Sequence, residues 1–304
     1  MRIKYFIFLF IMSLKIYSQQ INNDSSNFWE KITLRKSFES KNSNAEPAQI
    51  TYTKPKNKVD SWLLNAAIGF NILKENKHNK VLTLSPYFEY HLNTLIEKEQ
   101  DNWLAGLALE IQIHDISLNS DNSWTPILIS SVKYNNDNIK DITSFQGNYY
   151  ITFIARGTGM KARTFWIPNN TVKFGNLTKF LWSPYIGLEN ENRISTESNN
   201  DKGNIYRAYL RINSNFSLFP NNDKIKNKFE INFDWQYRYN LVENVTNLEK
   251  ISHNYFSTSF NYLFYISDDE KKSAKIGIDY VNGENPSINF EEQSFYAVTL
   301  KFKL

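Results

Sequence analysis

The sequence predicts an all-β fold, a transmembrane antiparallel up-and-down β-barrel. From residue 48 to the C-terminus, segments of ten or more residues alternate between apolar and polar side chains. These segments exceed the usual strand length of about 5–6 residues and meet the roughly 9–11 residues that a tilted membrane-crossing strand requires. The mean hydropathy is −0.51, and after the N-terminus no apolar run reaches the roughly 18 residues of a spanning helix. A bundle of membrane helices is therefore excluded.

The clearest strand runs from Phe229 to Leu241. Its odd-numbered residues are all apolar or aromatic, and its even-numbered residues are all polar or charged. A helix of period 3.6 would spread these apolar residues around its whole surface, whereas a strand places them on one face. In a soluble barrel the apolar face fills the interior, but in a membrane barrel it meets lipid and the polar face lines the lumen. Strand length and the 15% aromatic content favour the membrane version.

The composition excludes several classes of protein. The chain has no cysteine, which excludes a disulfide scaffold, a structural Cys–zinc site, a Cys nucleophile and an iron–sulfur cluster. A formal net charge of +4 among 35 basic and 31 acidic residues does not indicate a nucleic-acid partner.

The N-terminus, residues 1–18, is interpreted as a signal peptide. Arg2 and Lys4 form a basic start, residues 5–12 are apolar, and Ser18 offers a small residue for cleavage. The apolar run is too short to span a bilayer as an anchor, and no cysteine follows it that could carry a lipid. The chain is therefore expected to be exported.

The mature chain is expected to have two parts. Residues 19–46 are polar and show no sustained period, which predicts a flexible periplasmic segment. A plug or a partner-binding helix is the alternative for this part. Residues 47–304 are expected to form the barrel as a single domain.

The alternating segments and the turn-forming clusters between them predict twelve strands, with ten or fourteen as alternatives. An even number lets both ends of the chain lie in the periplasm. The expected strands cover 48–53, 61–73, 80–95, 102–115, 124–135, 147–156, 172–189, 204–218, 227–242, 253–267, 273–282 and 294–304.

The C-terminal strand carries the most specific signal. Tyr296, Val298, Leu300, Phe302 and Leu304 form one apolar face, and the sequence given stops there. This ending resembles the terminal strand of bacterial outer-membrane β-barrel proteins, although phenylalanine is the more usual last residue. The resemblance implies residence in the bacterial cell outer membrane, contact with its lipid, and recognition of this strand by the barrel assembly machinery. The Asn/Lys/Ile bias resembles proteins of the Bacteroidetes group, and no specific functional family is indicated.

The lumen face is where the sequence places candidate functional residues. By the alternation, basic residues outnumber acidic ones ten to five on this face, which would favour anionic solutes if a path exists; the alternative is that the charges only brace the interior. The carboxylates and histidines at residues 89–93 and 110–114 are weighed as a divalent-metal site, but ordinary lumen polarity is favoured and no metal or cofactor is expected. The lumen-lining candidates are Glu89, His91, Asn93, Glu110, His114, Arg207, Arg211, Glu230, Asp234 and Arg238.

Three functions follow from this interpretation. The favoured one is a small passive channel or a structural membrane protein with a polar, mixed-charge lumen, through which small solutes would pass. A second is a lipid-acting enzyme that resembles an outer-membrane phospholipase. That family carries His and Ser two residues apart, whereas here His91 is followed by Asn93, so no catalytic residue is assigned. The third is a binding module that uses loops 136–146, 190–203 and 243–252.

Overall fold

The structure is a computed structural model of the chain. It describes residues 28–41, 46–53, 60–77, 80–94, 99–116, 120–156, 162–196, 202–245, 251–267, 272–286 and 290–304. The chain divides into two compact units, residues 1–31 and 32–304. The described part of the first unit is the 3-10 helix η1 (Phe28–Lys31), so the expected signal peptide, residues 1–18, lies outside the described residues.

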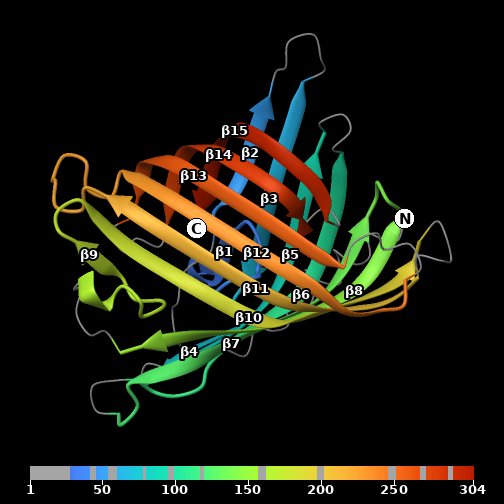
Figure 1. Ribbon diagram of the computed structural model, residues 1–304, viewed down its shortest axis with the longest axis horizontal. Helices are drawn as coiled ribbons and strands as arrows, with labels where there is room; N and C mark the ends of the chain where they lie inside the picture. Colours follow the sequence, from blue (N-terminus) through green and yellow to red (C-terminus); the bar gives the residue numbers. More distant parts are fainter. Residues whose placement is uncertain are drawn as a thin grey trace. The chain divides into compact units, whose positions relative to one another are not determined.

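Twelve antiparallel strands of the second unit close into a barrel (Figure 1). Each strand pairs with the next along the chain, and β15 pairs with β2 to close the ring. The predicted all-β, antiparallel up-and-down barrel and the predicted count of twelve strands are both confirmed. The strands are β2 (Ala48–Thr53), β3 (Ser61–Phe70), β5 (Lys80–Asn93), β6 (Gln100–Gln112), β7 (Trp124–Asp137), β8 (Ile142–Ala155), β10 (Thr178–Ser195), β11 (Gly203–Leu218), β12 (Phe229–Glu243), β13 (Ser252–Ile266), β14 (Ser273–Asn285) and β15 (Glu291–Lys303).

Further short strands pair with members of the ring. β1 (Ile32–Arg35) pairs with β3, β4 (Leu73–Lys77) with β5, and β9 (Val172–Phe174) with β10. The strand expected at 172–189 is therefore divided into β9 and β10, because a turn with Gly175 at φ 58° separates them. A positive φ of this kind is readily adopted only by glycine.

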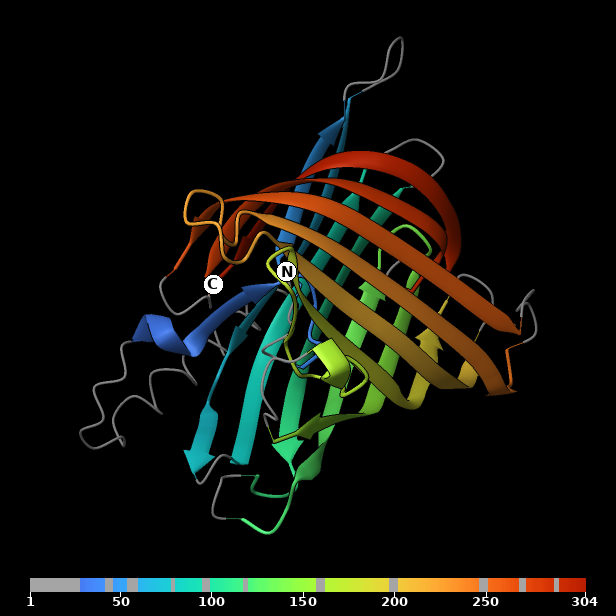
Figure 2. The ribbon, with the colours of Figure 1, turned by 60° about the vertical axis from the view of Figure 1, so that its left-hand side comes forward.

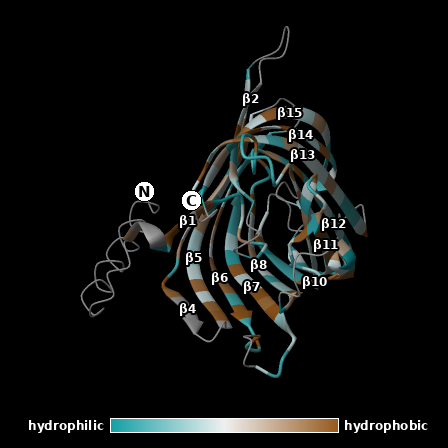
Figure 3. Cartoon of the chain, turned by 90° about the vertical axis from the view of Figure 1, so that its left-hand side faces the viewer, coloured by the Kyte–Doolittle hydropathy of each residue, from teal (hydrophilic) through white to brown (hydrophobic). Residues whose placement is uncertain are grey.

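The two faces of the wall differ sharply in polarity. On β12, Asp234, Gln236 and Arg238 point into the barrel and are buried, whereas Tyr239 and Leu241 point outward and are exposed. The same alternation appears as bands of opposite hydropathy along the strands (Figure 3). The interior is thus polar and the outer surface apolar, the reverse of an ordinary soluble barrel. None of the described helices is long and apolar enough to cross a membrane.

One expected loop is a tight hairpin. Residues 136–146 were expected to form a long surface loop, but β7 extends to Asp137 and β8 begins at Ile142. The Asp137 carboxylate accepts hydrogen bonds from the backbone N–H groups of Ile139 and Lys140, each at 3.0 Å. Asp141 takes a φ of 50°, which aspartate tolerates better than most residues. That loop is therefore too short to serve as the expected binding surface.

The wall has a local split between β8 and β10. Their pairing begins at Ile151 opposite Ile186, and nearer the end of the barrel the two strands separate. Asn169 fills this split: its backbone N–H donates to the Trp182 carbonyl at 2.8 Å, and its side-chain amide donates to the Phe153 carbonyl at 2.7 Å. The backbone and the side chain of this one residue thus supply hydrogen bonds that a neighbouring strand would otherwise make.

Candidate functional site: the barrel lumen

The barrel has two ends, which are named here by the last residue of the chain. At the Leu304 end, β15 terminates and β10 and β14 begin; at the opposite end lie the turn at residues 138–141, the end of β14 and the start of β15. Figure 2 shows the ring of strands from a second direction. These labels fix the position of each lumen residue along the barrel.

A short stretch of chain between β1 and β2 lies inside the lumen. We call its described residues, 36–41 and 46–47, the inserted segment. Its base is closed by the Lys36 N–H, which donates to the Glu46 carbonyl at 2.8 Å. Its acidic side chains reach two strands of the ring, with Glu39 contacting β7 and Glu46 contacting β11. This part of the chain was expected to be a flexible periplasmic segment, and its contacts place it within the barrel instead.

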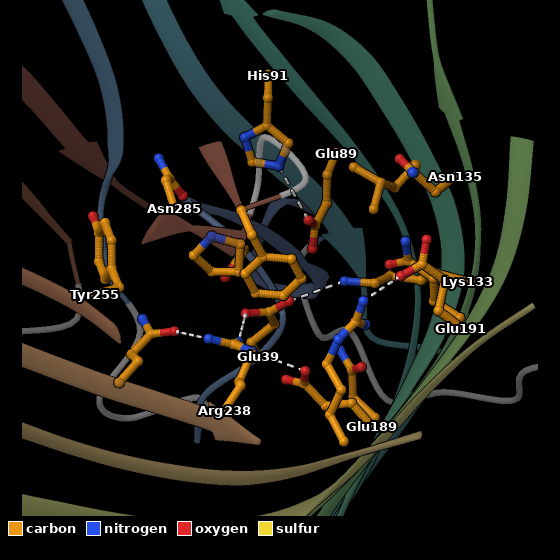
Figure 4. Close-up of a pocket in the computed structure, with 18 of the residues that line it drawn as sticks. Glu39, Glu89, His91, Lys133, Asn135, Glu189, Glu191, Arg238, Tyr255 and Asn285 are labelled. Carbon is orange, nitrogen blue, oxygen red and sulfur yellow. Dashed lines mark hydrogen bonds and ion pairs between the residues drawn. The ribbon is translucent and has the colours of Figure 1, made fainter. Parts of the chain in front are cut away.

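Two carboxylates anchor the inserted segment. Glu39 lies between Lys133, at 3.0 Å, and Arg238, at 4.0 Å (Figure 4). Glu46 forms ion pairs with Lys36, at 3.2 Å, and with Arg211. Glu39 is therefore held by β7 and β12 and Glu46 by β11, so ion pairs fasten the segment to the wall of the lumen.

An aromatic ring adds an apolar anchor. Phe38 is 6% exposed and stacks on Tyr87 with ring centroids 4.6 Å apart. Its backbone N–H donates to the Glu89 carboxylate at 2.8 Å, and the Arg35 guanidinium lies 4.7 Å from its ring centre. A Cβ added at Gly69 would stand 2.2 Å from the Phe38 ring. The ring can therefore pack here only because Gly69 has no side chain.

Replacing Gly69 with alanine is expected to lower the free energy of unfolding by about 1–3 kcal/mol, because the added methyl group would occupy space that the Phe38 ring fills. Urea unfolding of the barrel in detergent, followed by tryptophan fluorescence, measures this. In a Phe38→Ala background the same G69A change should cost much less, since the ring is gone. An equal cost in both backgrounds would contradict the proposed contact.

Arg238 organises a second set of contacts. It is 2% exposed, and it donates to Glu189 at 2.8 Å and to the Gln236 side-chain carbonyl at 2.8 Å. Its guanidinium lies 4.5 Å from the centre of the Tyr209 ring, and the Tyr150 hydroxyl donates to Glu189 from the other side. Arg238 therefore joins the wall to the inserted segment through Glu39.

Toward the opposite end, a third set of contacts includes residues of the last hairpin. Glu191 pairs with Arg193 at 2.8 Å and with Arg207 at 2.9 Å. Phe290 lies between Arg207, 4.6 Å from its ring centre, and His253, whose ring centroid is 4.2 Å away. The hairpin side chain thus covers the charged wall from within.

These contacts surround a small cavity of about 80 Å³ in the middle of the lumen. Its lining contains five acidic and five basic residues, so their formal charges cancel. The acids are Glu39, Glu46, Glu89, Glu189 and Glu191, and the bases are Lys36, Lys133, Arg207, Arg211 and Arg238.

A larger cavity of about 420 Å³ extends to the Leu304 end. It shares Lys36, Glu46, Tyr255 and Asn285 with the small cavity, so the two adjoin at the inserted segment. Its wall comes chiefly from β10–β15, and asparagine, serine and lysine side chains recur in it.

The structure places eight of the ten candidate lumen residues in the buried interior. Glu230 is half-buried and pairs with Lys275 at 2.7 Å. His114 is exposed and lies beyond Gln112, where β6 ends, so it is not part of the buried interior. The buried eight are Glu89, His91, Asn93, Glu110, Arg207, Arg211, Asp234 and Arg238.

The weighed metal site is not assembled. In the β5–β6 hairpin Glu89 lies opposite Leu104, whereas Glu110 lies opposite Thr83, so the two carboxylates sit far apart along the strands. Among the described residues, no three His, Asp or Glu side chains gather into a group that could hold a metal ion. Antiparallel pairing places the end of one strand beside the start of the next. Two residues can therefore share the lumen face and still lie at different heights in the barrel.

Sequence reasoning missed Lys36, Phe38, Glu39 and Glu46 as lumen residues. They lie in a stretch without periodicity. Phe38, Glu39 and Glu46 contact residues far away in the chain, and Lys36 pairs with Glu46. The single large aromatic at position 38 among polar residues was the one available signal.

The anchoring carboxylates predict an acid-sensitive lumen. Burial raises the pKa of Glu39, but Lys133 and Arg238 outweigh it and lower the pKa from 4.5 to about 2. Burial is likewise outweighed at Glu46, where Lys36 and Arg211 lower the pKa to about 2. A depressed folded-state pKa contributes stability that is present above the unfolded value and lost as the pH falls through the folded one.

The urea midpoint of the barrel should therefore fall as the pH drops from about 4.5 to about 2, because protonation discharges both anchors. A Glu39→Gln/Glu46→Gln variant should lose less over the same interval. Midpoints that fall in parallel in the two proteins would contradict this assignment.

The fold and the lumen together define a class of protein: a closed twelve-stranded β-barrel with a charged interior and an apolar exterior. No known protein family matches the chain, and no curated protein is similar to it in sequence.

Proposed function

We propose that the protein is a bacterial outer-membrane β-barrel that acts as a narrow passive channel for small solutes. The observation that carries the proposal is the inverted polarity of the wall. Large apolar side chains such as Ile186, Leu188 and Ile278 are more than half exposed on the outside, while arginine and glutamate are buried inside. In water this arrangement leaves an extensive apolar surface uncovered, whereas a lipid bilayer covers it.

Ladders of aromatic rings on the outer face support this location. Phe88, Trp103, Tyr134 and Phe145 follow one another across β5 to β8, with ring centroids 6.2, 5.3 and 5.5 Å apart. A second ladder crosses β9 to β12. Membrane barrels carry aromatic residues at the levels where hydrocarbon meets headgroups. The second ladder consists of Phe174, Phe180, Phe216 and Phe233.

The lumen supports a narrow channel rather than a wide pore. The inserted segment crosses it, and the charges around the small cavity cancel. Barrels of about 8 strands are filled by side chains and those of about 16–18 leave an aqueous channel, so twelve strands with a braced segment leave limited space. A structural role without transport is the other outcome of the test.

We do not propose a lipid-acting enzyme. The ring nitrogens of His91 contact Asn65, at 2.8 Å, and Glu89, at 3.4 Å. Nucleophilic catalysis of the expected kind needs an imidazole beside a hydroxyl group, and His91 lies in the lumen, away from the outer face.

Location is tested by separating the membranes of the producing cells and by comparing gel mobility with and without boiling. Recovery with the outer membrane and a mobility change on boiling are expected. Recovery in the soluble periplasm with a single heat-insensitive band would rule out the membrane barrel.

Transport is tested by conductance in planar bilayers. Small, steady current steps are expected from the purified protein. If the protein is inserted and heat-modifiable but the bilayers show no current, the channel is rejected and the structural role remains.

A further inference from the structure

The larger cavity has a charge imbalance that the smaller one lacks. Its lining contains four acidic residues and five basic ones. Every acid has a basic partner: Glu230 pairs with Lys275, Asp279 with Lys301, and Asp234 with Arg211. Glu46 already holds two cations. Each carboxylate that lines the cavity is therefore already paired with a cation of the protein.

Two lysines of this cavity are left over. Lys179 and Lys303 are half-buried, and within the part of the chain that the structure describes neither side chain has an acidic partner. Lys179 lies directly opposite Lys173 in the β9–β10 register, and like charges in such a pair are unfavourable. Arg35 and Lys275 repel Lys303 more strongly than Glu230 attracts it, and Glu230 forms its ion pair with Lys275. Both sites therefore concentrate positive charge, uncompensated by an ion pair at Lys179 and only partly compensated by Glu230 at Lys303.

Hydroxyl groups accompany both lysines. Ser217 lies directly opposite Lys179 on β11, and Ser273 lies directly opposite Lys303 on β14. All four residues line the cavity. An ammonium group next to a hydroxyl is a suitable set of donors for a carboxylate or phosphate oxygen. The Ser217 hydroxyl donates to the Asn215 side chain at 3.2 Å and would exchange this hydrogen bond for one to the ligand.

The size and position of the cavity suit a small ligand. Its volume of about 420 Å³ lies within the range of roughly 300–1,000 Å³ that is usual for ligand pockets. Lys179, Ser217, Ser273 and Lys303 all lie at or near strand ends on the Leu304 side, so a ligand would enter from that end without passing the inserted segment.

We propose that this cavity binds a small organic anion, a carboxylate or a phosphate ester, at Lys179 and Lys303. The ligand supplies the negative charge that the two sites lack. Binding from the Leu304 end does not require the barrel to conduct, so this proposal stands or fails separately from the channel.

The test is isothermal titration of the purified full-length protein in detergent. Citrate and glucose 6-phosphate are the carboxylate and phosphate probes, and glucose is the matched uncharged probe. Both anions, or one of them, should bind, and glucose should not. No heat of binding for either anion at millimolar concentration, or equal binding of glucose and glucose 6-phosphate, would overturn the proposal.

Variants then locate the site. Lys179→Gln and Lys303→Gln should each raise the dissociation constant about tenfold, the loss expected when one charge-assisted contact is removed, and the double variant should lose more. Lys224→Gln is the matched control, because Lys224 is exposed in the turn that connects β11 and β12 and does not line the cavity. Equal weakening by K224Q, or no weakening by the double variant, would contradict the assignment.

A salt series serves where a variant does not fold. Anion binding to the wild-type protein should weaken as sodium chloride is raised, because the attraction is between charges that salt screens. Binding that is independent of salt would reject the charge-based site, whatever the state of the variants.

Discussion

Replacing Arg238 with alanine is expected to lower the free energy of unfolding of the barrel by about 3–5 kcal/mol, the usual cost of removing one partner from a buried ion pair. The guanidinium is 2% exposed and bonds to Glu189 and Gln236 at 2.8 Å each. Without it, Glu189 keeps only the Tyr150 hydroxyl among these contacts, and Glu39 keeps only Lys133. The hydrogen bonds that are lost contribute less to this free energy than the cost of leaving the Glu189 and Glu39 charges buried with fewer partners.

Urea unfolding in detergent micelles measures the loss, and Arg163→Ala is the matched control. Arg163 is exposed in the short helix η3 (Ala162–Thr164), where removal of an arginine should change the unfolding free energy by less than about 0.5 kcal/mol.

A double variant separates two contributions to this loss: the buried Glu189 charge left without its cation, and the lost packing of the Arg238 side chain. Arg238→Ala combined with Glu189→Gln should be less destabilised than the sum of the two single variants, because the neutral amide needs no cation. If R238A unfolds like R163A, the ion pairs around Arg238 do not stabilise the barrel.

If the barrel is the channel proposed above, neutralising both anchors of the inserted segment is expected to widen its path through the lumen. In the Glu39→Gln/Glu46→Gln variant, Lys133 and Arg211 lose the carboxylates that draw the segment across the lumen. The segment should then leave its position for part of the time, and the conductance of single barrels in planar bilayers should rise several-fold. Asp223→Asn is the control, since Asp223 is an exposed carboxylate in the turn between β11 and β12.

A chemical probe checks that the segment itself has moved. The chain has no cysteine, so Ser37→Cys introduces a single thiol within the inserted segment. A water-soluble thiol reagent should label S37C faster in the E39Q/E46Q background than in the wild-type background. Higher conductance without faster labelling would show that the current takes another route.

The regular part of the fold could be predicted because period-2 alternation is a local property. The pattern from Phe229 to Leu241 predicts both the extent of β12, which runs to Glu243, and the face that carries Arg238. No long-range knowledge is needed, since neighbouring residues of a strand point to opposite faces whatever the strand pairs with.

The lumen contacts could not be predicted because they depend on register and on distant partners. Glu39 and Lys133 are 94 residues apart in the chain, and nothing near Glu39 indicates its partner. β1 has four residues, too few to show a period. Glu89 and Glu110 share a lumen face, as expected, but the hairpin register separates them.

The seam of the barrel links the inserted segment to the last residues of the chain. β1 and β2 both border β3, β1 at Ala67–Phe70 and β2 at Ser61–Asn65. Between them the chain leaves the wall, crosses the lumen and returns. On their other side stands the C-terminus: β2 pairs with Leu300–Phe302, and Leu34 and Leu304 exchange backbone hydrogen bonds of 3.3 and 3.4 Å. The final strand therefore closes the barrel against the two strands that flank the inserted segment, so the contacts that enclose the lumen also fix the ends of the segment that enters it.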